Sequence, residues 1–225
     1  IKQMEKSFQI LVLLLFVACG ANAQQEKGII GSTNWLSNWT EFNPAKVAYG
    51  EPNQILAGNI STNTKLLKKN VYLLQGAVYV DNNAVLTIEP GTVIIGDFDS
   101  GAALVITKGA SIVADGLETD SIVFTSNRSV KKAGDWGGIV ILGDAPINKF
   151  GGVASVNYDL DNALTVYGGN NPVASSGTLR YVRIEYAGKK VRGSGNFNGL
   201  FLGGVGNKTV IENVMVSFSA GDSFE

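Results

Sequence analysis

The stretch "LRYVRIEYAGKKVRG", residues 179–193, holds the densest set of side chains that could do chemistry. If Val182, Ile184 and Tyr186 point into a core, the alternation of a β-strand places the residues between them outside. The outward residues and the cations that follow them are Tyr181, Arg183, Glu185, Lys189, Lys190 and Arg192. A basic, aromatic-flanked stripe of this kind is a candidate binding site for an acidic sugar chain. Arg183 beside Glu185 also fits a solvated surface ion pair, so we assign no catalytic residue.

Other kinds of chemistry are excluded by composition. Cys19 is the only cysteine and the chain has no histidine, which rules out disulfides, thiol nucleophiles, Cys/His zinc sites and Ser-His pairs. The acidic pairs Asp97/Asp99 and Asp159/Asp161 leave calcium open, although neither continues with EF-hand spacing. The alternative is that these carboxylates cap their own turns. We therefore predict no cofactor and no metal ligand, with calcium as the weaker alternative.

The N-terminal residues indicate export. Lys6 precedes the apolar run "ILVLLLFVA" (10–18), which is too short for a bilayer span of ~20 residues and predicts a signal peptide over residues 1–23. Cleavage after Ala23 competes with lipidation of Cys19, because "FVACG" is similar to a bacterial lipobox. A lipid anchor would be the only membrane attachment. The formal charge of −1 over 225 residues also gives no reason to expect nucleic acid as a partner.

These side chains must be positioned by short strands. From Val71 onward, apolar runs rich in Val, Ile and Leu are interrupted by Gly, Asn, Asp or Pro, and no long stretch has a helical period. In "VLTIEPGTVIIG" (85–96) two runs meet at the tight corner Glu89-Pro90-Gly91. Hairpin turns of the Asn-Gly type are scarce. The pattern predicts an all-β solenoid, a parallel β-helix over residues 71–225, with roughly six or seven coils of ~20 to 25 residues.

The predicted inner wall of this solenoid is an aliphatic stack. Its members would be Leu86, Ile88, Val93, Ile95, Leu104, Ile106, Ile112, Val123, Ile139 and Ile141. Residues 24–70 are more polar and predict an N-terminal cap or arm, in which Trp35 and Trp39 either pack or form a sugar-stacking platform. Residues 149–176 are loop-like and predict an insert at a corner, where binding surfaces are often built.

The succession "VLTIEPGTVIIG", "GDWGGIVILGDAPIN", "SGTLRYVRIEYAG" and "NGLFLGGVGNKTVIENVMVSFSAGDSFE" resembles exported right-handed parallel β-helix proteins of Gram-negative bacteria. Members of this poorly characterised group are lipoproteins or surface proteins with a C-terminal sorting domain. The resemblance covers nearly the whole mature chain. It implies a right-handed helix, an outer-membrane, cell-surface or secreted location, and further coils after "DSFE", so that the chain would be truncated at its C-terminus.

These observations predict an exported β-helix module for binding, adhesion or structure, without catalytic activity in this segment. Its partners would be polysaccharide or other components of the cell envelope. The alternative is a carbohydrate-active β-helix enzyme, a lyase on an acidic polysaccharide. Converging carboxylates beside an Arg on one outer face would favour the lyase, and a polar outer face without them would favour the module.

Overall fold

The structure is a computed structural model that describes residue 36 and residues 38–193 and 195–225. Asn38–Glu225 form one compact unit, and the description below concerns this unit. Within the described residues, no helix has the length and apolarity needed to cross a membrane.

The described chain consists of short strands and two single-turn 3₁₀ helices. The strands are β1 (Gln54–Ile60), β2 (Thr64–Leu66), β3 (Val71–Val80), β4 (Val85–Ile88), β5 (Val93–Gly96), β6 (Ala103–Ile106), β7 (Ser111–Asp115), β8 (Ile122–Ser126), β9 (Ile139–Leu142), β10 (Ala154–Ser155), β11 (Val166–Tyr167), β12 (Gly177–Glu185), β13 (Lys190–Val191), β14 (Gly195–Asn196), β15 (Leu200–Gly203) and β16 (Val210–Ser217). The 3₁₀ helices are η1 (Pro44–Lys46) and η2 (Phe150–Gly152).

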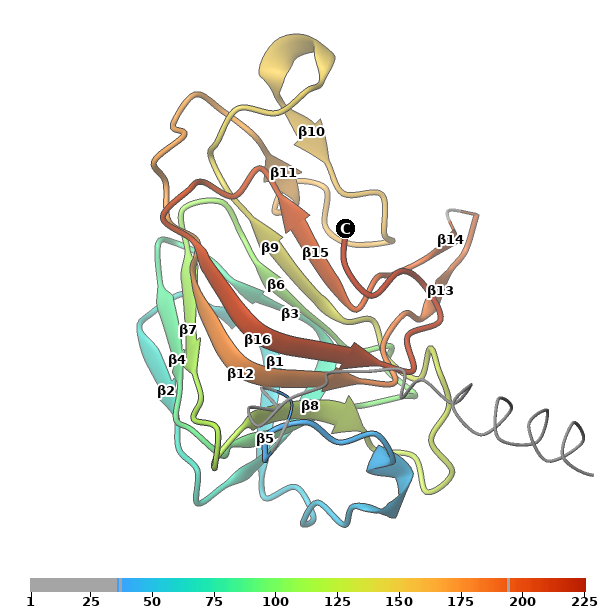
Figure 1. Cartoon of the computed structure of the whole chain (residues 1–225). Coiled ribbons are helices and arrows are strands. Elements are labelled where there is room, and N and C mark those ends of the chain that lie inside the picture. The colour runs from blue at the N-terminus through green and yellow to red at the C-terminus, as the bar shows by residue number, and fades with distance from the viewer. Residues whose placement is uncertain (1–35, 37, 194) are drawn as a thin grey trace, which may run out of the picture. The chain divides into compact units, whose positions relative to one another are not determined.

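Twelve of the strands form one parallel sheet that winds into three walls (Figure 1). Wall A contains the first half of β3, then β5, β8 and the second half of β12. Wall B contains the second half of β3, then β6, β9 and β15. Wall C contains β2, β4, β7 and the first half of β12. This arrangement confirms the predicted right-handed parallel β-helix.

The bent strands show how the corners are made. β3 pairs with β5 through Val71–Leu74 and with β6 through Ala77–Val80, so one strand passes from wall A to wall B. The predicted corner between β4 and β5 is also present, and Gly91 there has a φ of 75°. Only a residue without a Cβ adopts this conformation at little cost. "VLTIEPGTVIIG" is therefore two successive walls joined by a tight corner.

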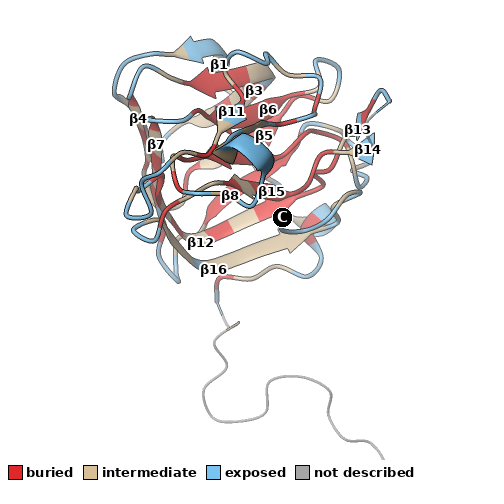
Figure 2. Ribbon diagram, turned by 90° about the horizontal axis from the view of Figure 1, so that it is seen from above, coloured by how far each residue is buried: buried red, intermediate tan, exposed pale blue. Residues whose placement is uncertain are grey.

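The core lies inside the walls, whose strands are largely buried (Figure 2). Equivalent positions of successive coils stack on one another there. On wall B, for example, Val78, Leu104, Ile139 and Leu200 occupy one row, and all four are at most 1% exposed. Burying one such aliphatic side chain stabilises the fold by about 1.5–3 kcal/mol. The predicted inner positions confirmed as core are Leu86, Ile88, Leu104, Ile106, Ile112, Ile139 and Ile141.

The prediction of inner residues is wrong on wall A. There Ile94 and Phe124 join the core, and the alternation of the strand turns Val93, Ile95 and Val123 to the outer side. Ile95 and Val123 are nevertheless buried, at 6% and 3% exposure. Because both sides of these strands are covered, both carry apolar residues, and the sequence pattern does not reveal which side faces inward.

The estimate of six or seven coils is also wrong for the described residues. Four coils follow Val71, and a fifth begins in the second half of β16. The coils are longer than predicted because loops of unequal length separate the walls, the longest running from β9 to β12. The described stack begins earlier than Val71, since β1 and β2, which lie in the segment predicted as cap or arm, pair with β3 and β4.

Candidate functional site

Arg183 and Glu185 project from the outer side of wall A, while Val182 and Ile184 enter the core as predicted. The two charged side chains are only 13% and 1% exposed. Segment 38–53, called the arm below, covers them: the Tyr49 hydroxyl donates to Glu185 Oε1 at 2.9 Å. The solvated surface ion pair is therefore wrong as an interpretation, because a segment far away in the sequence excludes water from it.

The buried cluster uses its own polar groups internally. Arg183 Nη2 donates to the Tyr49 hydroxyl at 2.9 Å, and Arg183 Nε lies 3.4 Å from Glu185 Oε1 without hydrogen-bond geometry. Burial raises the pKa of the Glu185 carboxyl, although Arg183 and the Tyr49 hydroxyl oppose the shift. Burial likewise raises the pKa of Tyr49, so its hydroxyl keeps its proton. The cluster holds the arm in place, and its two charged side chains, Arg183 and Glu185, are closed to a large ligand.

Tyr181, the first residue of the predicted stripe, occupies the corner between walls C and A with a φ of 49°. Its ring meets that of Trp39 edge-on, with centroids 5.8 Å apart. Trp39, which belongs to the arm, is 1% exposed, so it packs against the solenoid and is not accessible as a sugar platform. Trp35, Cys19 and Ala23 lie outside the described residues.

The three cations that follow are also separated from the buried pair. Lys189 Nζ donates to the Phe98 carbonyl at 3.2 Å and lies 5.6 Å from the centre of the Phe98 ring. Lys190 and Arg192 are exposed on the small hairpin β13–β14. The six residues of the predicted stripe therefore do not share one open face.

The acidic pairs proposed for calcium include carboxylates that cap turns. Asp97 accepts hydrogen bonds from the Ser100 amide at 3.0 Å and from Asn127 Nδ2 at 2.6 Å. Asp161 Oδ1 accepts from the Ala163 amide at 2.9 Å. Within the described residues, no group of three or more His, Cys, Asp or Glu side chains could hold a metal ion.

An accessible site is built instead by the connection between β9 and β12, residues 143–176, which contains the predicted insert of residues 149–176 and is called the insert below. The antiparallel pair β10–β11 lies within it. The insert packs onto the outer side of wall B through a second apolar cluster, separate from the core. That cluster contains Tyr79, Ala103, Val105, Val140, Leu142, Val156, Tyr158, Val191, Phe197 and Phe201. The apolar outer side of wall B therefore positions the insert.

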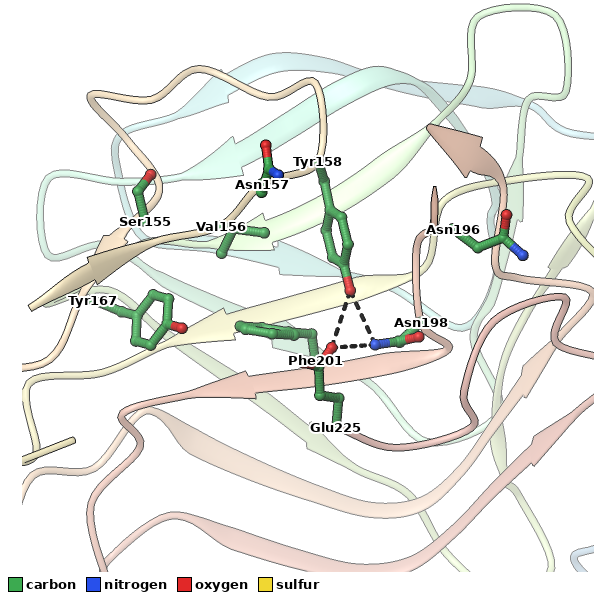
Figure 3. A pocket seen from close by; sticks show the side chains of 9 residues that line it. All are labelled: Ser155, Val156, Asn157, Tyr158, Tyr167, Asn196, Asn198, Phe201 and Glu225. Atoms are coloured by element: carbon green, nitrogen blue, oxygen red, sulfur yellow. Dashed lines mark hydrogen bonds between the residues drawn. The ribbon is translucent and has the colours of Figure 1, made fainter. Parts of the chain in front are cut away.

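Between the insert and β15 lies a cavity of about 300 Å³, here called the insert pocket (Figure 3). It is lined by Ser155, Val156, Asn157, Tyr158, Tyr167, Asn196, Asn198, Phe201 and Glu225. The Tyr158 hydroxyl donates to Glu225 Oε2 at 3.2 Å and accepts from Asn198 Nδ2 at 3.0 Å. Asn198 Nδ2 also donates to Glu225 Oε2. Three segments far apart in the sequence thus meet at one carboxylate.

Aromatic rings form much of the apolar surface around this carboxylate. The centroid of Phe201 lies 5.8 Å from those of Tyr158 and Tyr167, and both contacts are edge-on. Burial and the negative charge of Glu225 raise the pKa of both tyrosines, so their hydroxyls remain protonated donors at neutral pH. The pocket combines ring surfaces with amides, phenols and one carboxylate.

The arrangement is suited to binding polar, ring-shaped molecules. Aromatic faces cover apolar ring surfaces, while amide, phenol and carboxylate groups bond hydroxyls at defined positions. Hydrolysis of a glycosidic bond requires a pair of carboxylic groups in most enzymes, and Glu225 is the one carboxylate among the lining residues. The carboxylate pair of a glycoside hydrolase is therefore not among the residues that line this pocket.

The pocket residues were not identified from the sequence, although the insert was expected to build a binding surface. Tyr158 lies in the insert, whereas Asn198, Phe201 and Glu225 follow it by tens of residues. The sequence indicated a binding surface only for the insert, through the length of this segment and its content of Gly and Asn. Of the predicted stripe, Lys190 pairs with the lining residue Asn196 across β13–β14.

A family model described as a pectate-lyase-like beta helix domain matches residues 58–225, which include every residue that lines the insert pocket. No curated protein and no solved structure matches the chain.

Proposed function

Since the chain belongs to the family of pectate-lyase-like β-helix domains, we propose that it is an exported module that binds carbohydrate in the insert pocket. Export rests on the predicted signal sequence of residues 1–23, with a cell-surface, outer-membrane or secreted location in a Gram-negative bacterium. The partners proposed are polysaccharides or other components of the cell envelope. Attachment to a membrane would occur through a lipid on Cys19.

The observation that carries this proposal is the composition of the insert pocket. Tyr167 supplies partly exposed ring surface, with the rings of Tyr158 and Phe201 packed behind it, and Asn157 supplies an exposed amide beside the Glu225 carboxylate. Sugars present apolar ring faces and a periphery of hydroxyls, so they need both kinds of contact in one cavity. A cavity of about 300 Å³ is of the size that accepts small ligands.

A lyase acting on acidic polysaccharide is the second candidate, and the family match favours it. Such an enzyme needs a base near the sugar carbon that loses its proton and a positive group near the uronate. Arg183 and Glu185 are the nearest equivalent, but both are covered by the arm. The lyase therefore requires displacement of the arm, which the binding module does not.

The test is a binding survey of the purified full chain against immobilised neutral, amino and acidic glycans. Tyr167→Ala removes a partly buried ring from the pocket, and Phe150→Ala is the matched control, since Phe150 is fully exposed on the insert. We expect Tyr167→Ala to weaken binding about tenfold, which corresponds to ~1.4 kcal/mol, and Phe150→Ala to have no effect.

Two results would contradict the proposal. Equal affinity of native protein and Tyr167→Ala for the best glycan would place the binding site elsewhere. Appearance of unsaturated uronide ends in pectin or alginate digests, measured by ultraviolet absorbance with added calcium, would establish the lyase in place of the non-catalytic module.

A further inference from the structure

A second cavity lies on the other side of the insert, where walls B and C meet. This cavity, here called the corner pocket, has a volume of about 510 Å³. Three successive coils contribute polar residues to it: Ser61 from the first, Asp81 and Asn82 from the second, and Thr107 and Lys108 from the third. A surface built from equivalent corners of stacked coils continues along the axis of the solenoid, which suits an extended ligand.

The polar groups of the corner pocket leave hydrogen-bonding capacity unused. Asp81 Oδ2 accepts from Asn59 Nδ2 at 2.6 Å, but Asp81 Oδ1 is buried and has no hydrogen-bond partner in the part of the chain that the structure describes. Lys108 Nζ donates to the Gly168 carbonyl at 3.4 Å, which leaves the other ammonium hydrogens available. Asp81 Oδ1 is closed off from the cavity, so the groups open to a ligand are the exposed side chains of Asn82 and Lys108.

The two cavities share one wall, the strand β11. Its consecutive residues Val166 and Tyr167 line the corner pocket and the insert pocket respectively. The two cavities therefore adjoin each other at β11. A chain that occupies one cavity and extends past β11 reaches the other.

The charges of the two cavities constrain the chemistry of such a ligand. Glu225 is the charged residue of the insert pocket, and Asp81 is balanced by Lys108 in the corner pocket. The lining residues therefore carry one more negative than positive charge. A polyuronate would be repelled by this excess, whereas a chain of uncharged sugars would meet donors and acceptors for its hydroxyls.

We propose that the corner pocket is a second subsite for the glycan held in the insert pocket, and that the ligand is an extended chain of uncharged sugars. This inference rests on the proposed carbohydrate-binding function. It predicts that affinity grows with chain length until both cavities are occupied, because the second contact forms within a complex already made.

The experiment is calorimetric titration of the full chain with cello-, manno- and xylo-oligosaccharides from the disaccharide to the octasaccharide, and with oligogalacturonates of matching length. The variant Lys108→Gln removes an exposed ammonium of the corner pocket, and Tyr167→Ala alters the insert pocket. Thermal unfolding of both variants is recorded beside the native chain to exclude loss of the fold. For one of the uncharged series we expect at least a tenfold gain in affinity from the shortest to the longest member.

The variants separate the two proposals. Lys108→Gln is expected to weaken binding of the longest oligosaccharide at least threefold and to leave binding of the disaccharide unchanged. Tyr167→Ala is expected to weaken binding of both. Affinity that is independent of length, or a Lys108→Gln effect that is equal at all lengths, would overturn the second subsite while leaving carbohydrate binding intact. Tighter binding of oligogalacturonates than of the uncharged series would contradict the proposal that the ligand is uncharged. Failure of every series to bind would contradict the proposed function itself.

Discussion

Glu185 is the residue whose environment departs furthest from what its type would lead one to expect. It lies on the outer side of a wall, where a carboxylate normally meets water, yet its side chain is 1% exposed. Tyr49 and Arg183 supply the contacts that water would otherwise make. A buried charge with partners is tolerated, but removal of one partner leaves the rest uncompensated.

Titration of Glu185 should be visible in the stability of the protein. Its folded pKa is raised by burial above the ordinary value of 4.5, so the folded state binds this proton more tightly than the unfolded state. The stability that protonation contributes is present at low pH and lost as the pH rises through the folded pKa. Relative to the native protein, Glu185→Gln should gain stability as the pH rises above 4.5, measured by urea unfolding across the pH range. A stability difference that stays constant would contradict the raised pKa.

Removal of the Tyr49 hydroxyl should loosen the arm. Tyr49→Phe deletes a donor to Glu185 and an acceptor for Arg183, leaving two buried charged groups short of a hydrogen bond. We expect a loss of ~1–3 kcal/mol in the free energy of unfolding. Tyr167→Phe is the control, because its hydroxyl makes no hydrogen bond within the described residues, and it should change stability by less than ~0.5 kcal/mol. Equal losses in both variants would show that the cluster does not stabilise the arm.

At the scale of elements, the point at which the insert returns to the solenoid is the most constrained. β12 begins at Gly177, which has a φ of 116° and continues in parallel pairing with β7. A Cβ at this position would overlap the carbonyl oxygen of Ile112 in β7. The backbone of the neighbouring coil therefore leaves no room for any side chain at this re-entry.

Gly177→Ala should lower the stability of the folded protein by more than backbone strain alone would. A non-glycine residue with positive φ costs ~1–2 kcal/mol, and the overlap with Ile112 adds to this because the backbone there is held in the sheet. Gly193→Ala isolates the strain, since Gly193 has a φ of 83° and open space around it. In thermal unfolding, the melting temperature of Gly177→Ala should lie well below that of Gly193→Ala. Equal melting temperatures would mean that β12 can shift away from β7.

At the scale of the whole molecule, the described part of the stack of coils has inner strands and a first and a last strand. β6 and β9 have parallel neighbours on both sides, whereas β1 and β16 each pair with one strand in the part of the chain described. β16 also keeps Val214 and Val216 only partly buried. In such a linear array, each coil is stabilised chiefly by its nearest neighbours, so the outer coils open most easily.

Hydrogen exchange should therefore follow position along the stack. Amides of β6 and β9 should exchange at rates close to those of global unfolding, and amides of β1 and β16 orders of magnitude faster. Mass spectrometry of peptides from native protein measures both groups in one experiment. Protection of β16 equal to that of β9 would show that another segment covers its edge in solution.

The sequence by itself determined the class of fold and much of the core. Short Val/Ile/Leu runs joined by corners such as Glu89-Pro90-Gly91 leave little alternative to a parallel solenoid, and the inner rows of walls B and C follow from strand alternation. On wall A the same reasoning chose Val93 and Val123 in place of Ile94 and Phe124. Alternation identifies the inner side of a strand only when the outer side meets water, and here the arm and the loops cover it.

The tertiary structure decided which residues of the outer surfaces are covered and which line a cavity. It buried Arg183 and Glu185 beneath Tyr49, more than a hundred residues earlier in the chain, and it joined Tyr158, Asn198 and Glu225 around one cavity. Local pattern carries information about the period and boundaries of strands, because these depend on neighbouring residues. Which distant segment covers a wall depends on the packing of the whole chain, so a residue's exposure, its charge state and its place in a site were settled only by the fold.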